Sequence, residues 1–516
     1  MECLNEMLSR TVRLLGDRPF LVTDTQTLTY AEFDRQVSRL ANVLASLGVR
    51  KGEPVGLYLP SGPLLVTGYW ACQKLGAIPA PMSVMYRDTE IIGIVSRAGI
   101  GVMLTDPSTF PFAHAAQKQL PGLKHLLVGG GQAEGGLLLE PLMAQAPDQC
   151  ADVQCAPGDT ACLFFTSGTT GAPKGAMHSQ LSQHSALRDM FVYNRFRWGR
   201  EVLLDVLPVF NNFGATCLMN LSIYSGGTLV MHERWDTRRV LDAIRMHQVT
   251  YTAGTPTMFV YLCNEFDPAR DDLSSLRLAV TGGAPVPVGI LKQFNDAFHV
   301  PLIQIYGATE STGYNTGEPL IGVRKWGSAG VPIGSSTISI VDDAGRSLPT
   351  GERGEVLIAG DCVGKGYWDD AQASAKAFTA GGWLSGDIGY LDEDGYLFIV
   401  DRKKDLIISG GYNIYPLEVE DLLYKHPGVA VCALVGVADA VKGEIPAAVV
   451  VTRPGTPSDA AAAADIIDFC RRHIAAYKAP RQVYFVAEMP LGPSGKILKR
   501  ELRRRIADQQ LLLPVS

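Results

Sequence analysis

The stretch Thr166–Gly175 reads Thr-Ser-Gly-Thr-Thr-Gly-Ala-Pro-Lys-Gly and directly follows an apolar run, residues 161–165, that is typical of a buried strand. Its glycines accept positive φ and let backbone N–H groups approach an anion, while its hydroxyls add side-chain donors. Lys174 supplies a compensating positive charge. We interpret the stretch as a loop folded around phosphate oxygens. The residues expected to contact phosphate are Thr166, Ser167, Gly168, Thr169, Thr170, Gly171 and Lys174.

Two other interpretations of this loop are weaker. Polar Gly/Ser/Thr loops also occur on protein surfaces, but the density of glycines and hydroxyls beside a single lysine favours phosphate. A Walker A loop needs Gly-Lys followed by Ser or Thr, whereas Lys174 lies between Pro173 and Gly175. A P-loop kinase or GTPase is therefore disfavoured, and a magnesium ion must find its protein ligand elsewhere.

The composition limits the class of protein. A chain of 516 residues is too long for one ordinary core, so two or more domains are expected. With 47% hydrophobic and 19% charged residues it is globular, and a net charge of −6 disfavours nucleic acid as the main partner. Ten cysteines without a C-x-x-C pair favour free thiols over a disulfide or zinc framework. We expect a soluble cytoplasmic protein without a signal peptide or membrane span, acting on small molecules.

From Pro54 to Ile338, short apolar strand candidates alternate with segments of helical periodicity. Residues 249–252 precede a helical segment at 257–264, and residues 276–281 precede one at 288–298. This alternation predicts an α/β fold with mostly parallel sheets covered by helices, and ligands at the carboxyl ends of the strands.

The sequence pattern changes after Gly334. Short strand candidates separated by Gly and Asp turns predict a smaller β-rich subdomain there. A charge run, Asp401–Asp405, follows; by composition it is either a solvated face or a hinge. Beyond it, strands and helices from residue 406 onward predict a compact α+β domain.

Further motifs follow the phosphate loop in order. They are Tyr306-Gly307-Ala308-Thr309-Glu310, Trp383-Leu384-Ser385-Gly386-Asp387, Asp401-Arg402-Lys403-Lys404-Asp405, Ser409-Gly410-Gly411-Tyr412-Asn413 and Pro493-Ser494-Gly495-Lys496-Ile497. Together they resemble the adenylate-forming superfamily of acyl-CoA synthetases, non-ribosomal peptide adenylation domains and luciferases. The resemblance implies a large N-terminal domain, residues 1–400, a hinge at 401–405 and a small mobile C-terminal domain, residues 406–516.

The resemblance implies activation of a carboxylic acid by ATP to an acyl adenylate, with pyrophosphate release, and then transfer to the thiol of CoA. The phosphate loop would hold the β- and γ-phosphates. Thr309 would contact the α-phosphate, and Glu310 would be the Mg²⁺ ligand that the loop lacks. Asp387 would hold both ribose hydroxyls, with Arg402 as a second ribose or phosphate contact. The nucleotide would also meet Gly283, Ala284, Pro285, Tyr306 and Gly307.

Lys496 alone would be read as a solvated surface lysine. The resemblance implies instead that it enters the active site on the mobile domain, bridges the substrate carboxylate and the α-phosphate, and leaves when the domain rotates. Lys404 matches the hinge position, and Gly410 and Gly411 match the glycines of the pantetheine tunnel.

The acyl pocket is expected at Phe210, Asn211, Phe213, Gly282 and Ala308. Asn211 stands where acyl-CoA synthetases commonly carry a histidine, which either alters the mouth of the pocket or is a neutral exchange of one polar side chain for another. No acidic residue appears where amino-acid-activating relatives hold an amine, and no basic residue in the expected wall would meet a second carboxylate. Both absences favour an uncharged fatty or aromatic tail.

The leading interpretation is therefore an AMP-forming acyl-CoA ligase. A stand-alone ligase that loads a phosphopantetheinyl carrier protein is the nearest alternative. A luciferase-type monooxygenase shares the motifs, and a regulatory nucleotide-binding protein without turnover belongs to another class. The presence of Lys496, Glu310, Asp387 and Arg402 disfavours the last. A homodimer is among the assemblies that the sequence leaves open.

Overall fold

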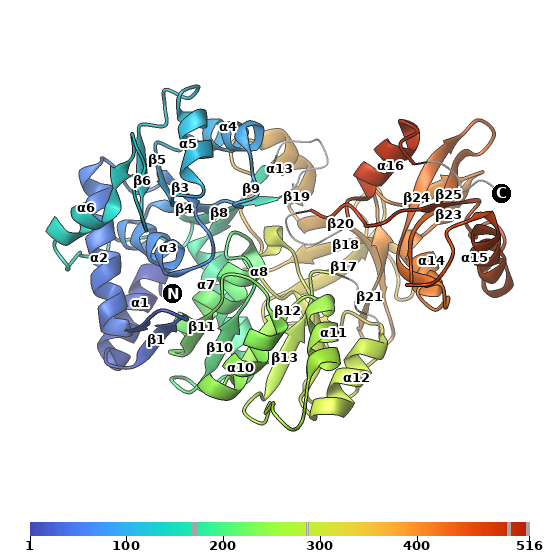
Figure 1. Cartoon of the computed structure of the whole chain (residues 1–516), viewed down its shortest axis with the longest axis horizontal. Coiled ribbons are helices and arrows are strands. Elements are labelled where there is room, and N and C mark those ends of the chain that lie inside the picture. The colour runs from blue at the N-terminus through green and yellow to red at the C-terminus, as the bar shows by residue number, and fades with distance from the viewer. Residues whose placement is uncertain (167–172, 285, 287, 493–496, 512–516) are drawn as a thin grey trace. The chain divides into compact units, whose positions relative to one another are not determined.

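The computed structural model describes residues 1–166, 173–284, 286, 288–492 and 497–511. Contacts divide the chain into two compact units, both drawn in Figure 1. The first unit comprises residues 1–338 and 357–384, and the second comprises residues 339–356 and 385–516. The expected hinge, residues 401–405, falls inside the second unit and stays a prediction.

The first unit is built on a sheet that has nine strands within the described residues, in the order β16-β15-β14-β13-β12-β10-β11-β1-β2. The strands from β14 to β1 run parallel, and antiparallel pairs complete the two ends. This confirms the expected parallel α/β architecture. The bounds are β1 Pro19–Val22, β2 Thr27–Thr29, β10 Val202–Asp205, β11 Thr228–Met231, β12 Tyr251–Gly254, β13 Leu278–Thr281, β14 Leu302–Tyr306, β15 Thr316–Gly317 and β16 Val331–Pro332.

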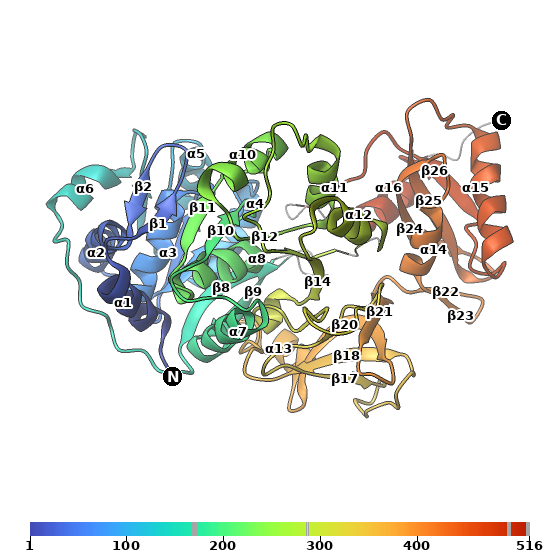
Figure 2. The same ribbon diagram turned by 90° about the horizontal axis from the view of Figure 1, so that it is seen from below.

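Helices cover both faces of this sheet, and Figure 2 shows α10 and α7 on opposite sides of it. On one face, α10, α11 and α12 pack against Leu204 and Val206 in one hydrophobic core. On the other, α7 and η1 pack against Leu203 and Tyr251 in a second core. The bounds are α7 Gln180–Tyr193, α8 Asn212–Gly214, η1 (a π-helix) Ala215–Asn220, α9 Leu221–Tyr224, α10 Thr237–His247, α11 Pro256–Glu265 and α12 Val288–Phe298.

A second, fully parallel sheet in the first unit has the order β4-β3-β5-β6-β7. Its helix α3 starts with Pro63 in the first turn and ends at Gly76, whose φ of 63° suits a glycine cap. The bounds are α1 Leu4–Leu15, α2 Tyr30–Ser46, β3 Pro54–Tyr58, α3 Pro63–Leu75, β4 Ile78–Pro81, α4 Asp88–Ala98, β5 Val102–Thr105, α5 Phe110–Gln117, β6 His125–Val128, β7 Leu137–Leu138 and α6 Leu139–Gln145.

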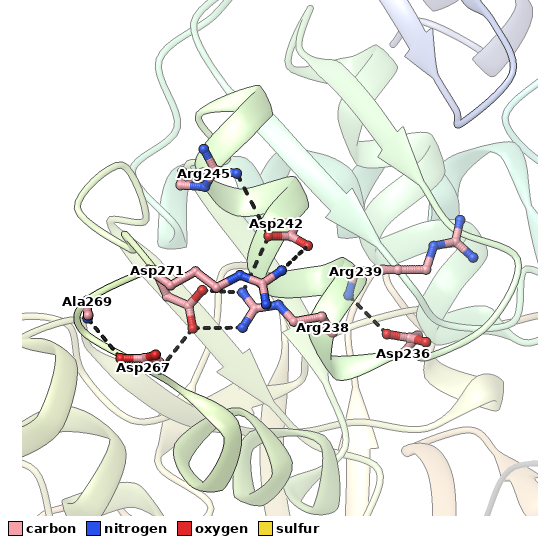
Figure 3. Close-up of polar contacts among 9 residues, drawn as sticks. Asp236, Arg238, Arg239, Asp242, Arg245, Asp267, Ala269 and Asp271 are labelled. Atoms are coloured by element: carbon pink, nitrogen blue, oxygen red, sulfur yellow. Dashed lines mark hydrogen bonds and ion pairs between the residues drawn. The ribbon is translucent and has the colours of Figure 1, made fainter.

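Helix α10 illustrates how the sequence fixes an element. Its N-cap, Asp236, accepts a hydrogen bond from the backbone N–H of Arg239, and its apolar side chains face the core. On its polar face Arg238 donates to Asp271 at 3.0 Å and pairs with Asp242, a network shown in Figure 3. The Asp271 side chain is almost fully buried, so this ion pair anchors α10 to the loop before β13 more firmly than an exposed pair would.

Two antiparallel strands, β8 (Thr160–Thr166) and β9 (Lys174–Ser179), form a separate pair. A further sheet has the order β17-β18-β20-β19, with β21 paired to β20, and supplies the β-rich region expected after Gly334. Its bounds are β17 Thr337–Val341, β18 Gly354–Ala359, α13 Ala371–Ala377, β19 Phe378–Thr379, β20 Gly382–Leu391 and β21 Leu397–Arg402.

The C-terminal part of the second unit is the expected α+β domain. Its sheet has the order β23-β22-β25-β24 with β26 parallel to β25, and separate hydrophobic cores lie on its two faces. No helix in the described part of the chain is long and apolar enough to cross a membrane. The bounds are β22 Ile407–Ser409, β23 Tyr412–Ile414, α14 Pro416–Leu423, β24 Val429–Asp439, β25 Gly443–Thr452, α15 Ala460–His473, β26 Gln482–Phe485 and α16 Lys499–Ala507.

Candidate active site

The β8–β9 pair presents the two ends of the predicted phosphate loop. Thr166, the last residue of β8, is the register partner of Lys174, the first residue of β9. Both are partly exposed. The expected phosphate contacts between them, Ser167, Gly168, Thr169, Thr170 and Gly171, lie outside the described residues.

Tyr367 connects two of the residues predicted from the sequence. Its hydroxyl donates to Glu310 Oε1 at 3.0 Å, and Lys174 Nζ lies 5.0 Å from the centroid of its ring. Burial and the Glu310 carboxylate raise the pKa of Tyr367, so the phenol stays protonated and remains a donor. The structure thus brings the lysine of the loop and the proposed metal ligand to one aromatic side chain that sequence reasoning missed.

Backbone pairing fixes Tyr367 in this place. Residues 364–368 lie along β9, where Met177 N–H donates to the Gly366 carbonyl at 2.9 Å and Trp368 N–H donates to the Gly175 carbonyl at 2.8 Å. The N–H of Gly364 donates to the carbonyl of Glu310 at 2.8 Å. One segment therefore binds both β9 and the Glu310 turn.

The Thr309–Glu310 turn follows the carboxyl end of β14, where ligands of parallel sheets bind. It is the 3₁₀ helix η2, Thr309–Ser311. Gly307 must be glycine, because a Cβ there would lie 1.9 Å from the carbonyl oxygen of Gly313. Tyr306, Gly307, Ala308, Thr309 and Glu310 are all partly exposed, as side chains at a ligand site have to be.

A buried polar network lies behind this turn. The amide of Gln183 donates to His178 Nδ1 at 2.8 Å and to Thr216 Oγ1 at 3.0 Å. Asn220 donates to Gln183 Oε1 at 3.3 Å and to the Tyr69 hydroxyl at 3.1 Å. Burial lowers the pKa of His178 to about 4, so the imidazole is neutral. No sequence motif pointed to these residues.

Several residues of the predicted acyl pocket lie around Phe213, and we call this part of the pocket the acyl wall. A Cβ at Gly283 would lie 4.0 Å from the Phe213 ring, and that ring packs edge-on against Tyr314 with centroids 6.5 Å apart. Gly282 is buried against Ile305, whose Cδ1 would lie 2.5 Å from an added Cβ. Ala284 is exposed, and Pro285 lies outside the described residues.

Asn211 has a structural role that the sequence did not reveal. Its Oδ1 accepts a hydrogen bond from the Gly214 backbone N–H at 3.1 Å, which makes it the N-cap of α8. Phe210, just before it, is partly exposed. The amide therefore starts the helix that carries Phe213.

In the second unit, Asp387 and Arg402 are register partners on β20 and β21. Arg402 Nε donates to Asp387 Oδ1 at 2.7 Å; the carboxylate is nearly buried and the guanidinium is half exposed. This pair orients both predicted ribose contacts.

The remaining predicted residues of the second unit lie on turns. Gly410 and Gly411 connect β22 to β23 with φ of 58° and 85°, values that favour glycine. Lys404 is exposed in the turn after β21. Lys496 lies outside the described residues.

Comparisons with known proteins agree with this architecture. The sequence model of the AMP-binding enzyme family matches residues 8–368, and that of the AMP-binding enzyme C-terminal domain matches residues 418–496. Feruloyl-CoA synthase of an Amycolatopsis species is 36% identical over 485 residues, covering 93% of this chain and 94% of that protein. The long-chain-fatty-acid–CoA ligase FadD13 of Mycobacterium tuberculosis is 34% identical over 483 residues, covering 93% of each chain.

Solved structures of similar enzymes have the same fold as this chain. ATP-bound MatB from Rhodopseudomonas palustris has a TM-score of 0.90 at 28% identity, covering 98% of this chain and 99% of that one. The anthranilate CoA ligase AuaEII with anthranoyl-AMP has a TM-score of 0.90 at 28% identity, covering 98% of each chain.

The chain belongs to the AMP-binding enzyme family of adenylate-forming proteins. Within it, the chain is an AMP-forming acyl-CoA synthetase, an acid–thiol ligase whose co-substrates are ATP and CoA.

Proposed function

We propose that this enzyme converts an uncharged fatty or aromatic carboxylic acid to its CoA thioester, using the residues described above. The observation that supports this most directly is that Lys174 and Glu310 both contact Tyr367, the lysine at the ring and the carboxylate at the hydroxyl. A cation and a carboxylate beside the ends of a phosphate loop are the groups that a nucleotide triphosphate and its metal require.

In the first half-reaction, a carboxylate oxygen of the acid attacks the α-phosphorus of ATP and the bond to the β-phosphate breaks, releasing pyrophosphate. Two anions must approach each other, so the protein has to neutralise charge and hold the groups in line. We assign the β- and γ-phosphates to Lys174 and the loop, the α-phosphate to Thr309, and the ribose to Asp387 held by Arg402.

The donor set fits Mg²⁺. Among the described residues no cluster of three or more His, Cys, Asp or Glu side chains could hold a metal ion. Mg²⁺ bound with nucleotides commonly takes only one or two carboxylates, its other ligands being phosphates and water. Glu310 would be that carboxylate, with its orientation fixed by Tyr367. When bound, the ion would neutralise charge on the phosphates.

In the second half-reaction, the CoA sulfur attacks the carbonyl carbon of the adenylate and AMP leaves. We propose that Lys496 serves only the first step, that the domain after a hinge at Lys404 rotates between the steps, and that Gly410 and Gly411 then border the pantetheine. Their positive φ places backbone without side chains at this turn.

The acid itself is proposed from the pocket. Phe213, Gly283 and Tyr314 form an aromatic wall that bears no charge. The two relatives named above support this: one is a feruloyl-CoA synthase and the other a long-chain-fatty-acid–CoA ligase, so one name gives an aromatic tail and the other an aliphatic tail. We also propose a cytoplasmic location, which the ten free cysteines support.

A pyrophosphate-release screen tests the proposal. Acids of varied length and aromaticity would be supplied with ATP and Mg²⁺, with CoA, with a phosphopantetheinyl carrier protein, or with neither. We expect pyrophosphate and AMP in stoichiometric amounts, and thioester formation with CoA. ADP as product would contradict the adenylation chemistry, and a thioester formed only on the carrier would replace CoA as acceptor. Light scattering of the same sample would show whether the enzyme is a homodimer.

A further inference from the structure

Asp205, the last residue of β10, differs from the other buried acids. Its side chain is fully buried. Oδ1 accepts a hydrogen bond from the Leu207 backbone N–H at 2.9 Å, but Oδ2 has no hydrogen-bond partner among the described residues. A buried polar atom left without a partner costs stability and calls for an explanation.

Each of the other buried acids in the described part of the chain has an ion pair or backbone hydrogen bonds to both oxygens, although Glu318 Oε1 also lacks a hydrogen-bond partner there. Asp401 accepts backbone hydrogen bonds on both oxygens. The remaining six form ion pairs: Asp189 with Arg188, Glu201 with Arg277, Asp271 with Arg238, Glu318 with Arg324, Asp387 with Arg402 and Glu420 with Lys499. Asp205 has neither arrangement. Burial raises the pKa of Asp205 well above its usual value, which favours the neutral carboxyl, whose O–H can donate a hydrogen bond.

Strand alternation determines which face of the sheet Asp205 occupies. Leu203 packs in the core that contains η1, whereas Leu204 and Val206 pack in the core that contains α10. Since successive side chains of a strand point to opposite faces, Asp205 shares the face of Leu203, beneath η1. Burial raises the pKa of the Cys217 thiol on η1, and so does the negative charge that Asp205 carries when it is ionised, which indicates that the two side chains lie near each other.

Cys217 in turn connects Asp205 to the acyl wall. It lies four positions after Phe213 on the continuous α8–η1 helix, so both side chains project from one side of that helix. Phe213 borders Gly283 and Tyr314. The Tyr314 hydroxyl is already paired with that of Tyr251, at 2.6 Å. Asp205 Oδ2 is therefore a candidate to meet a substrate beneath this wall. Two neighbouring groups, Thr281 Oγ1 just before Gly282 and Asn212 Oδ1 just before Phe213, are also buried without a partner among the described residues, and Asp205 is the one acid of the three.

We propose that Asp205 is a specificity-determining residue that donates a hydrogen bond to an oxygen on the tail of the acid, so that the preferred substrates carry a hydroxyl, ether or keto group remote from the carboxylate. The inference rests on the proposed function, because it assigns the tail of the acid to the Phe213 wall. Binding a substrate of this kind satisfies Asp205 Oδ2, whereas a purely hydrocarbon tail leaves it unpaired. A site built in this way discriminates against the analogue that lacks the polar group.

Matched acids test the proposal: para-hydroxycinnamate against para-methylcinnamate, and an omega-hydroxy fatty acid against a fatty acid of equal chain length. For each pair the ratio of kcat/KM values is measured in thioester formation. We expect the wild-type enzyme to prefer the hydroxylated member of at least one pair, and Asp205→Leu to reduce that ratio by about 10- to 100-fold. Asp205→Asn should keep most of the preference, because its amide still accepts from Leu207 and still donates.

Glu201→Gln is the matched control. It neutralises another buried acid, which lies just before the first residue of β10 and is paired with Arg277 at 3.1 Å, and it should lower stability without changing the ratio. Asp205→Val, which suits a strand, repeats the test if Asp205→Leu does not fold. A wild-type preference for the methyl members, or an unchanged ratio in the apolar variants, would overturn the proposal for Asp205. Failure of every acid to release pyrophosphate would instead overturn the proposed function.

Discussion

His178 Nε2 lies 2.6 Å from the carbonyl oxygen of Thr309, a residue 131 positions later in the chain. A carbonyl can only accept, so Nε2 carries the proton, and Nδ1 accepts from Gln183. The ring is thereby held in one tautomer between α7 and η2. This bond fixes the backbone of the turn that presents Thr309 and Glu310, and so makes His178 a positioning residue.

We expect His178→Leu to lower kcat for pyrophosphate release by about 10- to 100-fold, because the unpaired Thr309 carbonyl lets η2 shift from its position. The effect should fall on the adenylation step, measured by pyrophosphate release at saturating ATP. Thioester formation from preformed acyl adenylate should change much less. His178→Gln, which keeps a donor near Thr309, is the matched variant and should recover part of the rate. Equal losses in both half-reactions would argue for general destabilisation instead.

The lowered pKa of His178 also predicts that the free energy of unfolding depends on pH. Its pKa is about 4 in the folded chain, whereas an unfolded histidine titrates near 6.5, so the unfolded state binds more protons between these values. Stability supplied by the neutral ring is complete above about pH 6.5 and is lost as the pH falls toward 4, in total on the order of 3 kcal/mol.

The measurement is the thermal midpoint of wild type and His178→Gln across this range. The wild-type midpoint should fall more steeply on acidification, because the variant lacks the titrating ring. Parallel curves for the two proteins would contradict a buried neutral imidazole.

Much of the fold could be predicted because helices and strands leave a periodic pattern of apolar residues within short stretches of sequence. Helix α12 has the bounds expected from its periodicity, Val288–Phe298, and the parallel order follows from alternation of strands and helices. The region before α15 is where local composition misleads. Residues 454–465 are rich in Pro, Ser and Ala, which predicts a surface loop and a helix that starts only at residue 465. The helix instead begins at Ala460, because Asp459 caps a run of alanines, which are strong helix formers.

The site could be predicted only where function leaves a motif in one stretch of sequence. Glu310 and Lys174 belong to such stretches. Tyr367 and His178 do not, because their roles depend on partners far away in sequence, and an isolated aromatic or histidine is usually a core residue. Asp205 is similar: only its burial, seen in the structure, separates it from an ordinary residue at the end of a strand.

Tyr367→Phe tests the contact with Glu310. The variant keeps the ring beside Lys174 but loses the hydroxyl that donates to the carboxylate. We expect the Mg²⁺ concentration needed for half-maximal rate to rise by about 3- to 10-fold, since one hydrogen bond is worth about 1 kcal/mol. Stability should change little. Tyr390→Phe, on the stacked pair with Phe398, is the control and should leave the Mg²⁺ dependence unchanged.

Asn211→Ala tests the helix cap. Removing the Oδ1 that accepts from Gly214 should lower the free energy of unfolding by about 1 kcal/mol. Asn211→Asp, which keeps the acceptor, should retain wild-type stability, and chemical denaturation of the three proteins compares them. If Asn211→Ala changed acid preference without changing stability, the residue would act on the pocket and not on the helix.

Lys496→Ala and Lys404→Pro separate the two half-reactions. If Lys496 bridges the carboxylate and the α-phosphate only during adenylation, Lys496→Ala should lose pyrophosphate release by a factor of about 100 or more, because charge neutralisation at the reacting groups is lost. It should still form thioester from preformed acyl adenylate and CoA. Lys404→Pro restricts the backbone at the proposed hinge and should have the converse effect, since adenylation precedes the rotation. Single-turnover measurements of each half-reaction test both variants. Equal loss of both steps in Lys496→Ala would contradict alternation between two domain positions. Unchanged kinetics in Lys404→Pro would place the hinge elsewhere.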